Sequence, residues 1–242
     1  DLTVSALDQL RVALKGKVVD PAASPKFDLD FEISPFSPRK LLEDLSMPFP
    51  VETADPKVLT TLALKGFIDG SPEKISVKNG EVTLDDTRVS FFADAAEFEK
   101  PAISCNMEVD SINLDRYMPP PKEGAEPAPP PGGRSGAGAG TDYAPLRKPV
   151  IDGSLLVRDL TVAGARLADL NVRLAAKGGR YNLDPVNLAG YEGTVKAKAV
   201  LDVTKNTPAA SAELDARGVK VNPILKDLLD KDFLEGTLEA QM

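Results

Sequence analysis

The sequence contains no histidine, no tryptophan and only one cysteine. Without histidine, catalysis by Ser-His-Asp or Cys-His pairs is excluded, and so are zinc sites with histidine ligands. A single cysteine forms neither an internal disulfide nor a thiolate zinc site. These absences remove the commonest catalytic and zinc-binding arrangements, and we expect no catalytic residues, no metal site and no cofactor.

A basic charge excess and long apolar runs are absent as well. The 37 acidic residues outnumber the 29 basic residues, which argues against a nucleic-acid partner. No stretch is apolar over a membrane-spanning length, and neither an initiator methionine nor a signal peptide is present. We therefore expect a fragment of a longer protein, with any anchor or targeting signal outside this sequence.

What the sequence does contain is strict alternation of apolar and polar residues. Four apolar residues between positions 27 and 33, for example, alternate with Asp28, Asp30 and Glu32. Successive side chains of a strand point to opposite faces, so each such segment has one apolar face and one charged face. This pattern is typical of an antiparallel sheet with one side in water, and it predicts a mostly β chain of about ten or more strands.

Helical signals are few and short. Ser37 followed by Pro38 predicts one capped helix, and Asn222 followed by Pro223 predicts another. Such helices are too small to cover about ten strands. The apolar face must therefore either close on itself as a sandwich or barrel, or stay open as a trough. A large open apolar face is a liability in water unless it binds something.

A segment rich in proline, glycine and alanine divides the sequence. Residues 119–149 have almost nothing to bury, so we interpret them as a flexible linker or long surface loop. They separate a first β-rich region, residues 1–118, from a second, residues 150–242. The Gly-Ala-Gly-Ala-Gly stretch within the segment lacks a following Gly-Lys-Ser/Thr, which argues against a phosphate-binding loop. Both one continuous sheet and two separate bodies agree with this pattern.

A loose repeat crosses the proline-rich segment. The stretches that begin at Pro25, Pro101 and Pro208 each contain a turn proline, an alternating strand, a break and a capped helical turn. Unequal spacings between these copies exclude a solenoid of fixed period. We therefore expect loosely repeated units of strand, turn, strand and short helix.

Several short motifs occur in an order that resembles the AsmA family. Residues 153–203, GSLLVRDLTVAGARLADLNVRLAAKGGRYNLDPVNLAGYEGTVKAKAVLDV, are similar to the C-terminal region of that family. The similarity continues through residues 206–229 and residues 236–238. DRYMPP at residues 115–120, just before the proline-rich segment, and the upstream residues 34–42 are further hallmarks. The resemblance covers nearly the whole sequence.

The resemblance implies a non-enzymatic, periplasmic module of an inner-membrane-anchored protein of a Gram-negative bacterium, with a role in outer-membrane biogenesis. It also implies kinship with bridge-like lipid-transfer proteins, in which a curled β-sheet encloses an apolar groove for acyl chains. We therefore expect an elongated, twisted, one-sided antiparallel sheet curled into a groove, with phospholipid acyl chains as its partner. The alternative is a scaffold that binds outer-membrane or other envelope assembly proteins through exposed sheet edges.

The predicted groove lining consists of apolar residues at alternating positions of the expected strands. These residues are Leu10, Val12, Leu14, Phe27, Leu29, Phe31, Leu62, Leu64, Ile103, Met107, Leu170, Val172, Leu174, Val195, Leu201 and Leu214. Cys105 shares the register of Ile103 and Met107, so we expect it to be a small buried residue.

Acidic residues offer two competing interpretations. Asp28, Asp30 and Glu32 carry carboxylates suited to calcium, but on a strand they project from one face without an enclosing turn, so we expect a solvated face. A carboxylate-based glycosidase needs two acids that face each other across a cleft. Alternation instead places nearly all acids on the outer face, which disfavours an enzyme.

Overall fold

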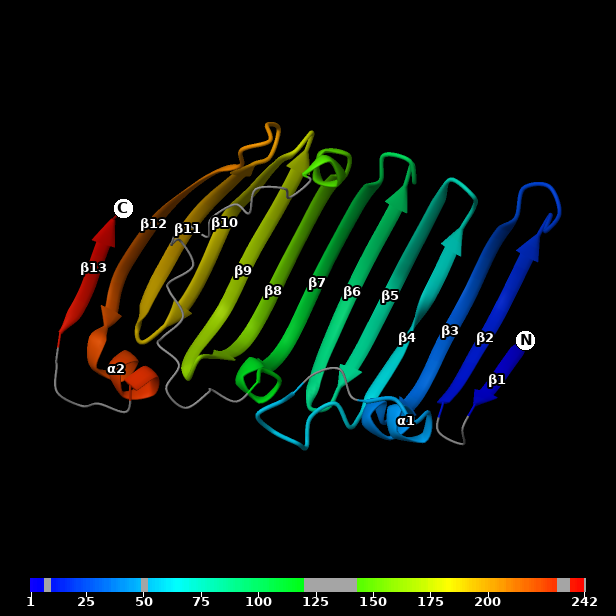
Figure 1. Ribbon diagram of the computed structural model, residues 1–242, viewed down its shortest axis with the longest axis horizontal. Coiled ribbons are helices and arrows are strands. Elements are labelled where there is room, and N and C mark those ends of the chain that lie inside the picture. Colours follow the sequence, from blue (N-terminus) through cyan, green and yellow to red (C-terminus); the bar gives the residue numbers. More distant parts are fainter. Residues whose placement is uncertain (7–9, 49–51, 120–142, 230–235, 242) are drawn as a thin grey trace.

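The structure is a computed structural model that describes residues 1–6, 10–48, 52–119, 143–229 and 236–241. Its strands form one open, twisted sheet of 13 strands in which spatial neighbours follow the order of the sequence (Figure 1). The strands are β1 (Leu2–Ala6), β2 (Leu10–Val19), β3 (Lys26–Phe36), β4 (Leu62–Gly70), β5 (Lys74–Leu84), β6 (Thr87–Ala96), β7 (Ala102–Asn113), β8 (Val150–Val162), β9 (Ala165–Lys177), β10 (Arg180–Gly190), β11 (Gly193–Asp202), β12 (Ala209–Lys220) and β13 (Thr237–Gln241). The predicted all-β fold class is confirmed.

The described helices are short, and three of them follow strands that the repeat predicts. The helices are α1 (Pro38–Asp44), the 3-10 helices η1 (Leu114–Arg116) and η2 (Ala144–Arg147), of which η2 precedes β8, and α2 (Val221–Leu229). Ser37 caps α1 as predicted, because its side chain accepts a hydrogen bond from the Lys40 N–H at 3.3 Å. The helices α1, η1 and α2 follow β3, β7 and β12, and all three lie along the same edge of the sheet (Figure 1).

One pair of neighbouring strands, β7 and β8, is parallel, whereas all other pairs are antiparallel. Parallel neighbours need a long connection that returns along the strand length, and residues 114–149 provide it. The Gly-Ala repeat and most of the predicted linker, residues 120–142, lie outside the described residues. Because β7 pairs with β8, the two β-rich regions belong to one continuous sheet.

The strand register places apolar residues directly opposite one another over most of the sheet. One row of paired residues crosses β1 to β9 through Val4, Val12, Ile33, Leu64, Val82, Val89, Val109, Val157 and Leu170. A second row crosses β3 to β12 through Leu29, Ile68, Val77, Ala93, Cys105, Gly153, Leu174, Leu183, Ala199 and Ala212. Both rows lie on the same side of the sheet, which we call the apolar face.

The apolar face has little cover. Among the described residues, eight hydrophobic side chains are buried, a very small core for a sheet of this size. Val109, Val157 and Leu160 form one buried cluster, against which partly buried side chains such as Leu114 pack. The apolar face is therefore an open surface and not the inside of a sandwich or barrel.

Candidate functional site

All sixteen residues of the predicted groove lining lie on the apolar face. They come from β2, β3, β4, β7, β9, β11 and β12, at positions that the ladder register aligns. None of the sixteen is buried. Ile103, Met107 and Leu201 are the most exposed of them, at 36%, 40% and 39%.

Apolar-face residues on β5, β6, β8 and β10 also belong to this surface but were not among the predicted lining residues. Examples are Val77, Phe91, Leu155 and Leu183. The register shifts between Val77 and Gly80 and between Leu183 and Val186, so strict alternation fails at both places. Asn79, with a φ of 49°, marks the first irregularity, and the Asp184-Pro185 pair marks the second.

Aromatic rings on the apolar face lie over glycines of neighbouring strands. A Cβ on Gly70 would come within 2.6 Å of the Phe27 ring, and a Cβ on Gly80 within 2.5 Å of the Phe91 ring. Each ring therefore occupies the space where a neighbouring side chain would stand. These rings extend the hydrocarbon surface across the backbone of the adjacent strand.

Cys105 is half-buried, so the expectation of a buried cysteine is wrong. Its position is nevertheless on the apolar face, opposite Gly153 of β8. A Cβ on Gly153 would lie 3.1 Å from Cys105 Sγ, so the sulfur covers that glycine. Cys105 stays partly exposed because no second layer of structure covers the face on which it stands.

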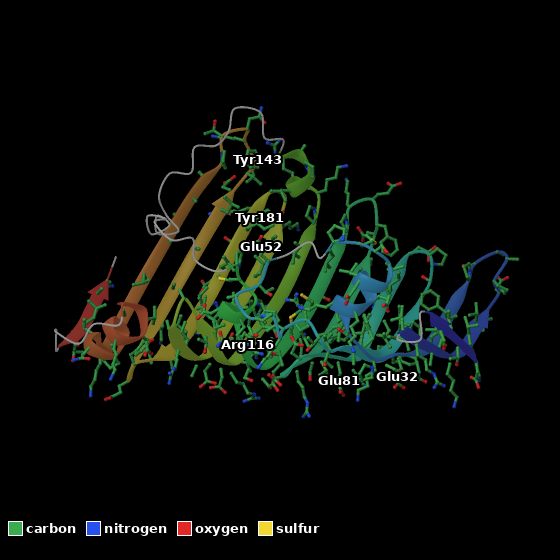
Figure 2. The ribbon with its side chains drawn as sticks, turned by 60° about the horizontal axis from the view of Figure 1, so that its bottom comes forward. Glu32, Glu52, Glu81, Arg116, Tyr143 and Tyr181 are labelled. Carbon is green, nitrogen blue, oxygen red and sulfur yellow. The ribbon has the colours of Figure 1, made fainter. Side chains whose placement is uncertain are left out.

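The opposite face of the sheet is charged. Glu32 and Glu81 project from this side, whereas Tyr181 lies on the other side (Figure 2). Ion pairs join cations and carboxylates across the charged face, among them Lys65–Glu81 at 2.8 Å, Lys78–Asp69 at 2.6 Å, Lys74–Asp94 at 3.3 Å, Arg173–Asp152 at 3.2 Å and Arg158–Glu108. Asp28, Asp30 and Glu32 are exposed here, as expected for a solvated face.

A hollow of about 840 Å³ lies over the charged face, and its lining includes Glu81 and Glu108. Each of these carboxylates is already paired with a cation, Glu81 with Lys65 and Glu108 with Arg158. The hollow is an open depression between rows of side chains. It therefore does not provide the enclosed pair of acids that a glycosidase mechanism needs.

One long side of the sheet, which the ends of successive strands form, carries a series of polar contacts, and we call it the braced edge. It contains α1, residues 52–61, η1 and α2 (Figure 1). From α1, Arg39 Nε donates to the Val58 carbonyl at 2.6 Å and Arg39 donates to Thr53 Oγ1 at 2.5 Å. Val58 itself is fully buried.

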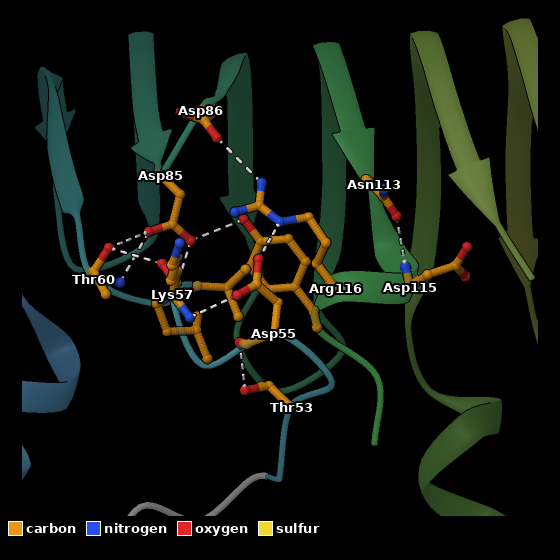
Figure 3. A network of polar contacts seen from close by, with 12 residues as sticks. Thr53, Asp55, Lys57, Thr60, Asp85, Asp86, Asn113, Asp115 and Arg116 are labelled. Carbon is orange, nitrogen blue, oxygen red and sulfur yellow. Dashed lines mark hydrogen bonds and ion pairs between the residues drawn. The ribbon is translucent and has the colours of Figure 1, made fainter. Parts of the chain in front are cut away.

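The middle of the braced edge is a network around Asp85 (Figure 3). The Asp85 carboxylate accepts hydrogen bonds from the backbone N–H groups of Leu59 and Thr60, at 2.7 and 2.9 Å, and from the Tyr117 hydroxyl at 2.9 Å. Arg116 Nε donates to Asp55 at 2.8 Å. Residues 52–61 are thus fastened to η1, far along the sequence.

These contacts shift the pKa values of the groups that make them. Burial opposes ionisation of Asp85, but the hydrogen bonds from backbone N–H groups and Tyr117 outweigh it, so the pKa of Asp85 is lowered. Burial and the hydrogen bond to Asp85 raise the pKa of Tyr117 to about 12. A hydrogen bond from the Lys57 N–H and another from Arg116 lower the pKa of Asp55. Both aspartates therefore act as fixed acceptors near neutral pH.

Further polar contacts continue the braced edge toward α2. Asp115 accepts hydrogen bonds from the N–H groups of Ala163 and Gly164, at 2.5 and 2.8 Å, and so ties η1 to the turn between β8 and β9. The Tyr191 hydroxyl donates to Asp227 of α2 at 3.1 Å. Sequence patterns did not reveal this edge, since its partners lie far apart in the chain.

The fold and this surface define a class of protein: an open, one-sided β-sheet with an uncovered hydrocarbon face and one braced edge. The chain belongs to the AsmA family, whose family model matches residues 95–242. Membership suggests a role related to outer-membrane biogenesis or lipid transport, within a bacterial envelope family that is generally non-enzymatic. No curated protein and no solved structure matches the chain. Over the ranges that the structure describes, every helix falls short of the length and apolar content needed to span a membrane.

Proposed function

We propose that this chain is a periplasmic, non-enzymatic module that shields phospholipid acyl chains on its apolar face during outer-membrane biogenesis. The observation that carries the proposal is the extent of the uncovered face, which crosses the sheet while only eight described hydrophobic residues are buried. Each acyl CH₂ that leaves water for this surface contributes about 0.8 kcal/mol. The contact is non-directional, so it requires no catalytic group.

Matched charge substitutions on the two faces test the proposal. Met107→Glu with Val172→Glu places two carboxylates on the apolar face, and both side chains are at least partly exposed. Asn106→Glu with Asn171→Glu adds the same two carboxylates at the preceding positions, which point to the charged face. We expect mass spectrometry of gently purified protein to detect phospholipid with the parent and the charged-face variant, and much less with the apolar-face variant. A lipid-free parent protein, or equal lipid in both variants, would contradict the proposal.

A second candidate function is a scaffold for envelope assembly proteins. The observation in its favour is that β1 and β13 stand at the two ends of the strand order, each paired on one side only. An extended segment of a partner protein binds such strands through backbone hydrogen bonds. Photo-crosslinkers at Thr3 and Glu239, compared with one at Glu81, test this function. Equal protein crosslinking from all three positions would count against it.

A further inference from the structure

Three segments that are distant in the sequence meet at the other ends of the strands, on the side of the sheet opposite the braced edge. Arg147 of η2 donates from Nε to the Val203 carbonyl at 2.7 Å and from Nη2 to Asn206 Oδ1 at 3.1 Å. The Tyr181 hydroxyl donates to the Leu146 carbonyl at 2.7 Å. These bonds fix η2 against the β9–β10 and β11–β12 turns. We call residues 144–148, 177–181 and 201–206 the basic corner.

The basic corner gathers positive charge on a chain whose net charge is −8. Its cations are Arg147, Lys148, Lys177, Arg180 and Lys205, and its one acid is Asp202. Within the described ranges, none of the five cations forms an ion pair. The Asp202 carboxylate instead accepts hydrogen bonds from the Thr204 N–H at 2.9 Å and the Thr204 hydroxyl at 2.6 Å. Asp202 also interacts with Arg180 and Lys205. Among the described residues of the basic corner, one negative charge therefore stands against five positive charges.

Two of these cations stand directly opposite each other. Lys177 pairs with Arg180 across the hairpin between β9 and β10, and both side chains are exposed. Like charges at directly opposed positions destabilise a sheet. On its other side Arg180 stands opposite Asp202 of β11, which offsets part of this repulsion. An anionic partner would offset the rest.

Exposed apolar side chains accompany the cations. Leu146 is 42% exposed and Leu201 is 39% exposed, and Leu201 pairs with Tyr181 at the end of the apolar face. Lys177 and Arg180 stand on the charged face of the same strand ends, so cations and exposed leucines border this corner from two sides. Cations close to exposed leucines and a tyrosine are typical of protein surfaces that lie in the headgroup region of anionic membranes. A soluble polyanion would engage the cations and leave the leucines in water. The adjoining β6–β7 turn carries Glu97 and Glu99 with one cation, Lys100, so the excess of cations does not extend into that turn.

We propose that the basic corner docks on the surface of a membrane that contains anionic phospholipid. The cations contact lipid phosphates while Leu146 and Leu201 enter the headgroup region. Since Leu201 also lies on the apolar face, docking places the end of that face against the bilayer. The residues substituted to test docking differ from those substituted to test acyl-chain shielding, so each proposal is tested independently of the other.

Vesicle flotation with the whole chain tests the docking. One set of vesicles is phosphatidylcholine alone, and the other contains phosphatidylcholine with phosphatidylglycerol. The corner variant carries Lys148→Gln, Lys177→Gln, Arg180→Gln and Lys205→Gln, and it keeps Arg147 because that side chain holds the corner together. The matched control carries Lys40→Gln, Lys57→Gln, Arg88→Gln and Lys226→Gln, four exposed cations at the braced edge. A second variant, Leu146→Ser with Leu201→Ser, removes the apolar contacts and keeps every charge.

We expect the parent to float with the phosphatidylglycerol vesicles in a salt-dependent manner, and the corner variant to bind about tenfold or more weakly. The control variant should bind like the parent, and the serine variant should bind more weakly than the parent. Equal losses in the corner and control variants, equal binding to both vesicle types, or unchanged binding of the corner variant would overturn the proposal. Co-purified lipid is measured on the same samples, so a loss of docking is distinguished from a loss of acyl-chain binding.

Discussion

At the scale of single residues, Asp85 shows how one side chain organises a segment distant in sequence. Its carboxylate accepts hydrogen bonds from the backbone N–H groups of residues 59 to 61 and from the hydroxyl of Tyr117. No local pattern marks this role, because an Asp-Asp pair that follows an alternating apolar segment is typical of an ordinary hairpin turn. The turn is present between β5 and β6, and the same residue also fastens the braced edge.

The lowered pKa of Asp85 leads to a prediction about pH. Its folded-state pKa lies below the ordinary value of 3.8, so its stabilising effect is present above that value and is lost as pH falls through the folded pKa. We expect Asp85→Asn to reduce the free energy of unfolding at pH 6, and the gap between parent and variant to narrow below about pH 4. Urea unfolding at several pH values measures this gap. A gap that stays constant with pH would contradict the assignment.

At the scale of elements, the braced edge explains why the short helices matter. They cover little of the apolar face, but α1, η1 and α2 lie beside polar contacts that hold one edge of a thin sheet in a fixed shape. The repeat predicted a helical turn after each of three strands, and the structure confirms it. The contacts between these turns were not predictable, since Arg116 and Asp55 are separated by 61 positions.

The Arg116–Asp55 ion pair is the element-scale test of the braced edge. The two side chains are about one-third and one-quarter exposed, at 32% and 27%. A double-mutant cycle with Arg116→Met and Asp55→Asn should give a measurable favourable coupling, and the amides of residues 52–61 should exchange faster in either variant. Arg158→Met with Glu108→Gln, a more exposed pair at 57% and 47%, should give less. A larger coupling for that exposed pair would contradict the role of the braced edge.

At the scale of the whole molecule, the parallel β7–β8 pair sets where the helices fall. In a fully antiparallel sheet, strands an odd number of places apart run in opposite directions, so β12 would oppose β7. Because β7 and β8 are parallel, β3, β7 and β12 run in the same direction. The helices that follow them, α1, η1 and α2, therefore lie along the same side of the sheet. The long connection at residues 114–149 makes that pair feasible.

An uncovered apolar face also predicts that bound amphiphile stabilises the whole chain. A ligand that binds only the folded state raises stability with its concentration, by about 2.7 kcal/mol at 100 times its Kd. We expect lysophosphatidylcholine below its micelle concentration to raise the Tm of the parent in proportion to the logarithm of its concentration. The Met107→Glu, Val172→Glu variant should show a much smaller rise, and the Asn106→Glu, Asn171→Glu control a rise like that of the parent. A Tm that is insensitive to lysophosphatidylcholine in the parent would count against an open, binding-competent face.

The sequence alone determined the strands, the short helices and the face to which most apolar side chains belong. It could do so because alternation along a strand is a local property, set by backbone geometry at each pair of residues. Only the tertiary structure decided that the two β-rich regions form one sheet, that its apolar face stays uncovered, and that one edge is braced while the other carries a basic corner. These features depend on which strands become neighbours and on contacts between residues such as Arg147 and Val203, which no local pattern encodes.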